Sequence, residues 1–284
     1  MTNLRQRSAL AERAVRAGGA VARDAFRGEF SVETKADKND LVTDVDREAQ
    51  RQIVHTVTEE FPDEPFVNEE NSEDSAGTGA EGPPSQRTAP TVDTVPDSGP
   101  CWIVDPIDGT ANFARGIRVW ATSVAAVEDG EAVAAATYLP AMQDIYTAGP
   151  ESPTRNGQRL ETSDRTDPET FAVGVVAAWS DDRSDRLGAL ARAINERCGD
   201  SRRFGSSQAT LGFVASGELE AAVTTEPTTP WDTIAGVELV RAAGGTVTNL
   251  DGDHWTHDSE GLVASNGQTH DAVVSVVHEA LADA

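Results

Sequence analysis

The sequence predicts an α+β fold, with helices and an antiparallel sheet in its first half and alternating strands and helices in its second half. Three patterns support this prediction. Two segments with helical apolar spacing open the chain, strand-like segments follow around an Asp-Gly turn at 129–130, and strand and helix patterns alternate after Asn156-Gly157. We therefore expect two parts, residues 1–152 and 153–284.

Two amphipathic helices are predicted before residue 62. The first covers residues 4–26, and a polar loop from Thr34 to Asp40 follows it. The second begins near Thr43 and ends before Pro62. Thr43 with Asp46 three residues later is a pattern typical of a helix N-terminus.

The segment 71–99 interrupts these patterns. It contains no Leu, Ile, Phe or Trp and is rich in Gly, Pro, Ser and Thr. We expect a mobile acidic insertion without apolar anchors. A functional lid is the alternative, and the composition favours a passive loop.

The remaining elements follow from short apolar segments and helical periodicity. Predicted strands cover 101–104, 119–127, 132–139, 144–148, 171–177, 219–224, 246–248 and 262–264. Predicted helices cover 184–197, 206–216, 231–243 and 270–281.

The net charge of −25 is the most unusual bulk property. The chain has 48 acidic and 23 basic residues, and Lys35 and Lys38 are its only lysines. A protein that binds nucleic acid through charge would show the opposite balance. Because the acids are spread along the whole chain, we favour a surface adapted to high salt, and hence a halophilic source, over an acidic surface for a partner.

Location and redox state follow from what the sequence lacks. No apolar segment is long enough for a membrane helix, and the N-terminus has no signal-peptide core, so we expect a cytoplasmic protein. The two cysteines, Cys101 and Cys198, form no metal-ligand pattern, and we expect both to be core residues without a disulfide.

The stretch 104–110 carries the clearest chemical signal. A predicted buried strand runs into Asp105 and Asp108, and Gly109-Thr110 follow at a predicted helix start. Carboxylate oxygens suit Mg²⁺, Gly109 lets the backbone approach a ligand closely, and amides at a helix start favour a phosphate oxygen. The alternative is two ordinary turns, Asp-Pro and Asp-Gly, and the spacing alone does not decide between them.

Other acidic positions strengthen the metal interpretation. Glu69 and Glu70 are adjacent carboxylates, which hinder folding unless a cation neutralises one. Lys35 and Asp46 flank the polar loop, and Asp232 opens a helix, where its alternative role is an ordinary N-cap. We expect the carboxylates of Asp105, Asp108 and Asp232 to lie in a solvated cleft.

These motifs resemble the inositol monophosphatase family, the lithium-sensitive magnesium phosphatases. The run from Asp105 to Thr110, with Asn112-Phe113, looks like the family's first signature, and Trp231 to Gly236 looks like its second. The Glu69-Glu70 pair and Gly205-Ser206-Ser207 also match. The resemblance extends over nearly the whole chain apart from segment 71–99.

The resemblance implies a layered αβαβα sandwich, commonly a homodimer, that binds two to three Mg²⁺ ions and a small phosphate substrate. The acidic charge and the lack of a long apolar segment predict no nucleic-acid or membrane partner. One ion would be held by Glu69, Asp105 and the Ile107 carbonyl, and a second by Asp105, Asp108 and Asp232. A third, weaker ion would use Glu69 and waters.

The resemblance also implies catalytic and substrate-binding roles. Asp46 with Thr110 would orient the attacking water and take its proton, Lys35 would tune Asp46, and Glu69 would act through the metal. The implied substrate contacts are Gly109, Thr110, Gly205, Ser206, Glu226 and Asp232.

The expected activity is hydrolysis of a small polyol or sugar phosphate, with inositol 1-phosphate as the leading substrate. Fructose 1,6-bisphosphate and a nucleotide 3′-phosphate are the alternatives. A catalytically silent, metal-binding regulatory relative is the alternative from another class. Magnesium-dependent phosphate release would distinguish an enzyme from such a relative.

Overall fold

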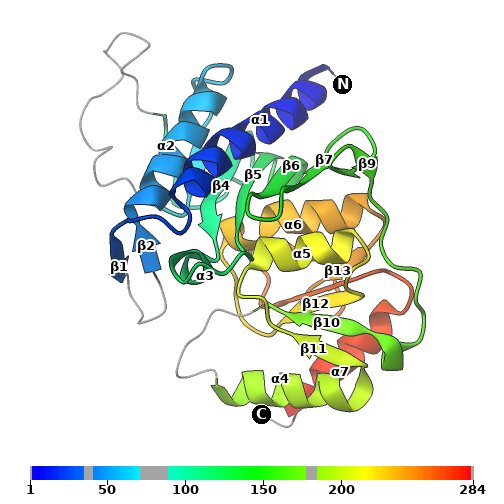
Figure 1. The fold of residues 1–284 in the computed structure, drawn as a ribbon. Helices are drawn as coiled ribbons and strands as arrows, with labels where there is room; N and C mark the ends of the chain where they lie inside the picture. The colour runs from blue at the N-terminus through cyan, green and yellow to red at the C-terminus, as the bar shows by residue number, and fades with distance from the viewer. Residues whose placement is uncertain (1, 35–40, 71–88, 177–183, 283–284) are drawn as a thin grey trace.

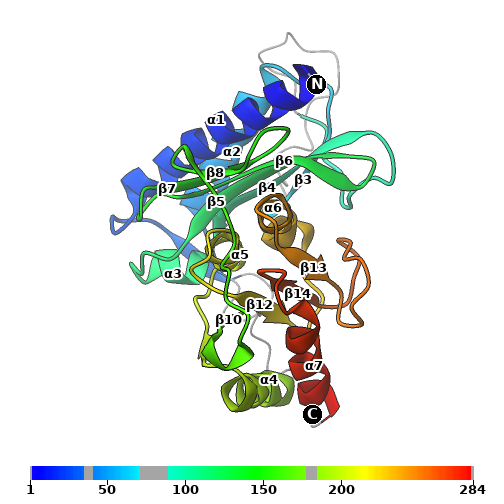
Figure 2. The same cartoon turned by 90° about the vertical axis from the view of Figure 1, so that its right-hand side faces the viewer.

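The computed structural model describes residues 2–34, 41–70, 89–176 and 184–282, and five layers make up its fold (Figure 1). Helices α1 (Thr2–Ala25) and α2 (Asp44–Thr58) cover one face of a seven-stranded sheet. Helices α5 (Ser207–Ala215) and α6 (Pro230–Ala242) lie between that sheet and a five-stranded sheet. Helices α4 (Ser184–Arg197) and α7 (His270–Ala282) cover the outer face, as Figure 2 shows from the side. The layered αβαβα sandwich is confirmed.

The seven-stranded sheet is antiparallel except at one edge, where β3 runs parallel to β4. Its strands, in spatial order, are β3 (Phe66–Asn68), β4 (Pro100–Asp108), β5 (Ala121–Glu128), β6 (Glu131–Leu139), β7 (Asp144–Ala148), β8 (Thr154–Arg155) and β9 (Gln158–Arg159). The predicted hairpin is confirmed as β5–β6. Both turn residues, Asp129 and Gly130, have positive φ, as a tight hairpin requires. Because β8 pairs with β7 and β9 pairs with β8, this sheet continues past residue 152.

The five-stranded sheet mixes parallel and antiparallel pairs. Its strands, in spatial order, are β11 (Asp200–Arg202), β10 (Ala172–Val175), β12 (Ala221–Thr224), β14 (Leu262–Ser265) and β13 (Thr246–Thr248). A separate hairpin joins β1 (Val32–Thr34) to β2 (Leu41–Thr43). The sequence did not predict β1, β2, β3, β8, β9 or β11, because two or three residues show no measurable alternation and the pairing partner stabilises them.

The end of the predicted insertion is packed against the core. Val95 is buried in the cluster that contains Ile103, and the Val92 amide donates to the Phe66 carbonyl at 2.9 Å. The expectation that this segment has no apolar anchor is therefore wrong for residues 89–99. Residues 71–88 lie outside the described residues.

Two further expectations concern the cysteines and membrane-crossing helices. Cys101 and Cys198 are buried and free, as predicted. Among the described residues, no helix combines the length and the apolar character that a membrane crossing needs.

Candidate metal centre and active site

A β-bulge brings the two aspartates of the first motif onto one face of the sheet. In a regular strand, residues three apart point to opposite faces. Here Asp105 pairs with Ser123 and Asp108 with Ala121, so three steps on β4 match two steps on β5. The extra residue restores a common face, and Pro106 is tolerated because a bulge needs no regular ladder bond there. The strand therefore includes both aspartates, beyond its predicted end at Val104.

The parallel edge strand places Glu69 beside the same point. Asn68, the last residue of β3, pairs with Val104, and the Glu69 amide donates to the Val104 carbonyl at 3.1 Å. Glu69 thus follows the end of β3 at the position of Asp105 along the neighbouring strand. Its charge raises the pKa of the Asp105 carboxyl. The side-chain amide of Gln50 on α2 holds the next residue, because it donates to the Glu70 carbonyl at 2.6 Å and accepts from the Glu70 amide at 3.1 Å.

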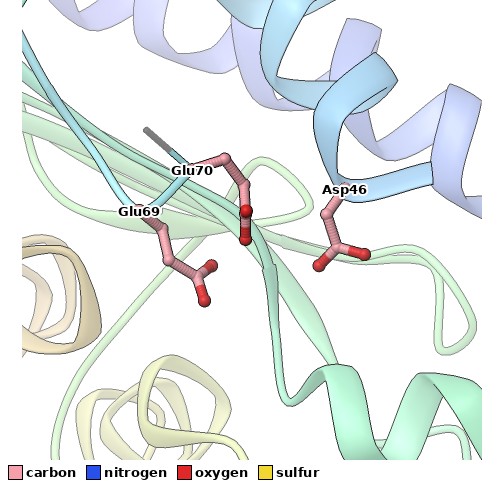
Figure 3. Close-up of side chains that lie close together, drawn as sticks. All are labelled: Asp46, Glu69 and Glu70. Atoms are coloured by element: carbon pink, nitrogen blue, oxygen red, sulfur yellow. The ribbon is translucent and has the colours of Figure 1, made fainter. Parts of the chain in front are cut away.

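The acidic side chains form two neighbouring clusters. Asp105, Asp108 and Asp232 each offer a carboxylate oxygen within 4.8 Å of the others, and so do Asp46, Glu69 and Glu70. Figure 3 shows the second cluster, in which Asp46 at the start of α2 faces the two glutamates that follow β3. The structure thus brings together every predicted acidic metal ligand and adds Glu70 to the group.

The clusters are buried more deeply than expected. Asp105 is 1% exposed and Asp108 4%, whereas Asp232 and Glu69 are partly exposed. The prediction of a solvated cleft is wrong for the two aspartates of β4. Bulged strand β4 lies inside the sheet, covered on both faces, so its carboxylates leave water when the chain folds.

Burial and mutual repulsion raise the pKa values of these carboxyls. Burial, together with the charges of Glu69, Asp108 and Asp232, raises the pKa of Asp105 well above its ordinary value. Burial and the charge of Asp232 raise the pKa of Asp108 to about 7. Such a group of ionised carboxylates is unfavourable unless a cation neutralises it.

Asp46 and Thr110 are in contact, as the resemblance implies. The Thr110 hydroxyl lies 3.1 Å from Asp46 Oδ1 and 2.9 Å from the Ile107 carbonyl oxygen. The other oxygen, Oδ2, accepts from the Thr43 amide at 2.9 Å and contacts the Thr43 hydroxyl in a complete capping box. The predicted cap therefore fixes Oδ2 and turns Oδ1 toward Thr110. Burial raises the pKa of Asp46 to about 6.

The first turn of α5 holds Asp108. Its Oδ2 accepts from the Gln208 amide at 2.7 Å and from the Ser206 hydroxyl, and its Oδ1 accepts from the Ser207 amide at 3.1 Å. The Ser206 hydroxyl also accepts from the Ala209 amide as the N-cap of α5. Ser206 is 4% exposed, so its hydroxyl serves the carboxylate and the helix.

Asp232 is not the N-cap of its helix. Thr229 occupies the N-cap position, Pro230 is the first helical residue, and Asp232 is the third. The Thr229 hydroxyl donates to Asp232 Oδ2 at 2.5 Å. The alternative interpretation of Asp232 as an ordinary cap is therefore wrong, and its carboxylate turns toward Asp105 and Asp108.

Two predicted substrate-binding glycines meet at the junction of the two sequence halves. Gly109 has φ +89°, and a Cβ there would lie 2.8 Å from the Gly205 carbonyl oxygen, so a side chain is excluded on both grounds. The Asn112 amide secures the junction by donating to the Val119 carbonyl at 2.6 Å and the Phe204 carbonyl at 2.7 Å.

The remaining predicted residues are placed as follows. Glu226 is buried just after β12, and one of its carboxylate oxygens lies 3.7 Å from Arg186 on α4. Lys35 lies outside the described residues. The sequence did not predict the contact between Arg186 and Glu226, because they are 40 positions apart and share no motif. It also did not predict the contacts of Gln50 and Gln208, because both have the pattern of ordinary helix residues.

The donor set fits Mg²⁺. All the candidate ligands are oxygens, and Asp105 Oδ1 is buried yet accepts no hydrogen bond from any residue that the structure describes. Asp108 retains lone-pair capacity on Oδ1, since its other bonds concentrate on Oδ2. The fold and this centre define a layered α+β protein with a candidate Mg²⁺ centre built from carboxylates.

Comparison with known proteins identifies the family. The profile described as Inositol monophosphatase family matches residues 3–282, so this chain belongs to that family. It is 32% identical over 250 residues to the fructose-1,6-bisphosphatase/inositol-1-monophosphatase of Thermotoga maritima, covering 88% of this chain and 87% of the relative. It is 28% identical to the inositol-1-monophosphatase of Bacillus subtilis, covering 96% and 97%. Like these relatives, the chain is a phosphoric monoester hydrolase.

Two further matches are a relative that is not named as a phosphatase and a solved structure. The Nus factor SuhB of Escherichia coli is 29% identical, covering 97% of each chain. The structure of an IMPase from Thermotoga maritima matches with a TM-score of 0.81 and 29% identity over 99% of each chain.

Proposed function

We propose that this protein hydrolyses the phosphomonoester of a small polyol, with inositol 1-phosphate as its preferred substrate. The convergence of Asp105, Asp108 and Asp232 beside the Asp46–Thr110 pair supports this proposal most directly. The double name of the Thermotoga maritima relative makes fructose 1,6-bisphosphate the second candidate.

Mg²⁺ is the cofactor of this site. We propose that Glu69, Asp105 and the Ile107 carbonyl hold one ion, and that Asp105, Asp108 and Asp232 hold another. Glu69 with waters remains the proposed site of a third. When bound, the ions supply positive charge that stabilises the attacking and leaving oxygens of the phosphoryl transfer.

The chain's own residues would position and deprotonate the nucleophile. A water bound to Asp46 Oδ1 beside the Thr110 hydroxyl would attack phosphorus, and its proton would pass to Asp46. The ester P–O bond breaks, and the alcohol product takes a proton from solvent. A base whose pKa lies near 6 is suited to this transfer, because it is ionised at neutral pH and still basic enough to accept.

The remaining contacts would select the substrate. We propose that Gly109, Thr110 and Gly205 lie against the phosphate and its ester oxygen, and that Glu226 and Asp232 meet the polyol hydroxyls. Ser206 contributes by holding Asp108, since its hydroxyl bonds are used there. Lys35 is proposed to tune Asp46.

A substrate panel tests this proposal. Phosphate release is measured from inositol 1-phosphate, fructose 1,6-bisphosphate and a nucleotide 3′-phosphate, in high salt, with Mg²⁺ and with EDTA. We expect Mg²⁺-dependent release with the highest kcat/KM for inositol 1-phosphate. A higher value for another compound would reassign the substrate, and no release from any of them would identify a silent relative.

The acidic surface is proposed to be an adaptation to high salt, consistent with a halophilic source and a cytoplasmic location. The excess of acids is spread along the chain, and arginines on helices far apart in the sequence pair with acids, as in Arg16–Glu12 and Arg197–Glu279. A protein with this charge repels itself unless salt screens it.

A further inference from the structure

One buried residue links two of the proposed metal-ligand segments. Gln208, on the first turn of α5, is fully buried. Its backbone amide donates to Asp108 Oδ2 at 2.7 Å, and its side-chain Nε2 donates to the Trp231 carbonyl oxygen at 2.7 Å. Trp231 directly precedes Asp232, so Gln208 connects Asp108 on β4 with Asp232 on α6.

The amide of Gln208 is not accounted for by folding alone. Its Oε1 is buried and accepts no hydrogen bond from any part of the chain that the structure describes. Leaving a buried acceptor unpaired disfavours folding, and an apolar side chain of the same length would avoid that cost. A polar side chain at this position therefore calls for another explanation.

Close helix packing directs the amide toward the metal-ligand segment. Gly236 on α6 faces α5, where a Cβ would lie 2.6 Å from Leu211 Cβ and 3.0 Å from Gln208 Oε1. The absence of a side chain lets the two helices approach until Oε1 lies against Gly236. Nε2 then points along α6 to its first turn, where it meets the Trp231 carbonyl.

We propose that Gln208 is a positioning residue that sets the spacing between the carboxylates of Asp108 and Asp232. The inference rests on the proposed function of these two aspartates as ligands of one ion. By fixing the Trp231 carbonyl, Gln208 fixes the orientation of the first turn of α6 and hence of Asp232. Groups that orient metal ligands typically change metal affinity 10- to 100-fold when they are lost.

The test uses Gln208→Met, which keeps the length of the side chain and removes both polar atoms. Mn²⁺ binding to the protein without substrate is measured by calorimetry, and the melting temperature is measured without metal. We expect about tenfold weaker Mn²⁺ binding, with a melting temperature equal to or above that of wild type. Turnover at saturating Mg²⁺ should approach that of wild type. The Mg²⁺ concentration that gives half-maximal turnover should be higher than for wild type.

Asn266→Leu is the matched control. Asn266 is a buried amide that donates to the Arg165 carbonyl at 2.9 Å. Asn266 follows Ser265, which pairs with Ala221 at the start of β12. Glu226 follows the other end of β12, so Asn266 lies at the end of this sheet that is away from Glu226. This variant should lower the melting temperature and leave Mn²⁺ affinity unchanged.

Two results would overturn the inference. One is Mn²⁺ affinity within about twofold of wild type in folded Gln208→Met, well below the usual range for such groups. The other is a parallel loss of affinity in the Asn266→Leu control, which would make the effect merely structural. If Gln208→Met does not fold, Gln208→Ala takes its place with the same criteria. Failure of wild type to bind Mn²⁺ would instead contradict the proposed function.

Discussion

At the scale of single residues, the site depends on which oxygen of each carboxylate is already engaged. Asp46 Oδ2 is held by Thr43, and Asp108 Oδ2 is held by Ser206 and Gln208. Each Oδ1 accepts one bond, from the Thr110 hydroxyl at Asp46 and from the Ser207 amide at Asp108, and keeps lone-pair capacity for the proposed chemistry. An aspartate-to-asparagine substitution therefore has a preferred orientation at each position, because Oδ2 accepts from two donors and the amide oxygen replaces it best.

The Asp46–Thr110 pair should act as one unit. In Asp46→Asn, the amide oxygen keeps the capping box and the NH₂ group faces Thr110, so the helix survives and the base is lost. Turnover should fall about 100-fold or more, the usual range for a positioned proton-transfer group, and Thr110→Ala should do the same. The double variant should be little worse than either single variant. Steady-state phosphate release at saturating Mg²⁺ measures all four proteins.

Thr110→Ser is the control for that experiment. It keeps the hydroxyl and should retain most of the rate. If Thr110 served only as part of a helix start, Thr110→Ala would cost about 1 kcal/mol of stability and little turnover. Losses that multiply in the double variant would mean that the two side chains act on different steps.

Asp108→Asn should separate stability from activity. The NH₂ group would take the place of Oδ1, so the proposed metal ligand is lost and turnover should fall by more than about 100-fold. Burial and Asp232 raise the pKa of Asp108 to about 7, so the ionised carboxylate opposes folding increasingly as the pH rises toward and through that value. The variant loses the bond from the Ser207 amide at every pH, so without Mg²⁺ its melting temperature relative to wild type should rise as the pH is raised from about 5 to 8. Near-wild-type turnover would contradict the two-ion scheme.

At the scale of secondary-structure elements, α6 has a proposed metal ligand, Asp232, in its first turn and a half-buried acid, Glu238, in its middle. Glu238 packs on this helix where burial raises the pKa of its carboxyl to about 7, Arg241 opposes the shift, and Glu131 adds to it. The folded protein thus binds this proton more tightly than the unfolded chain. Stability is present at low pH and falls as the pH rises from about 4.5 to 7.

Glu238→Gln should remove that loss. The variant should be more stable than wild type at pH 8 by about 1–3 kcal/mol and similar to it at pH 4.5. Urea unfolding at the two pH values measures the difference. Glu260→Gln, at an exposed glutamate, is the control and should show no pH-dependent gain. An equal gain at both pH values would mean that the effect is not titration of Glu238.

The segment after β3 divides into two parts with different expected tolerance. Residues 71–88 contain no large apolar side chain, so replacing them with a short Gly/Ser linker should change stability little. Val95, 5% exposed, belongs to the core, and Val95→Ala should cost about 2 kcal/mol. Val32→Ala, at a valine that is 49% exposed, is the matched control and should stay within about 0.5 kcal/mol.

Thermal and urea unfolding measure these three variants. A large loss of stability in the 71–88 replacement would show that this segment contributes to the core. Intact folding with a large loss of turnover would instead identify it as a functional lid.

At the scale of the whole molecule, the net charge of −25 sets the expected dependence on salt. If the acidic surface is an adaptation, the melting temperature should rise steeply from about 0.1 M, where the Debye length is ~10 Å, to molar KCl. Low-salt dialysis should unfold the protein. An uncharged osmolyte at equal osmolarity is the control, because it does not screen charge. Full stability at about 0.1 M salt would favour an acidic partner surface.

Assembly remains a prediction from the family resemblance. Sedimentation of the protein in high salt would show whether it is a homodimer, as we expect.

The sequence alone was sufficient for the class of protein. The order and length of the two signature motifs indicated the family, helical periodicity located α1, α2 and the later helices, and Thr43 with Asp46 predicted the capping box. Periodicity and helix caps depend on residues that are close together in the sequence, so they can be recognised without knowledge of the fold. The sequence also indicated Glu69, Asp105, Asp108 and Asp232 as candidate site residues.

Only the tertiary structure decided how those residues meet. The spacing of Asp105 and Asp108 would put them on opposite faces of a regular strand, and the bulge that reunites them exists only against β5. The burial of the carboxylates, the core position of Val95 and the link made by Gln208 depend on elements distant in the sequence. Long-range pairing and packing produce these features, and no local pattern of residues records which partner a strand or helix will find.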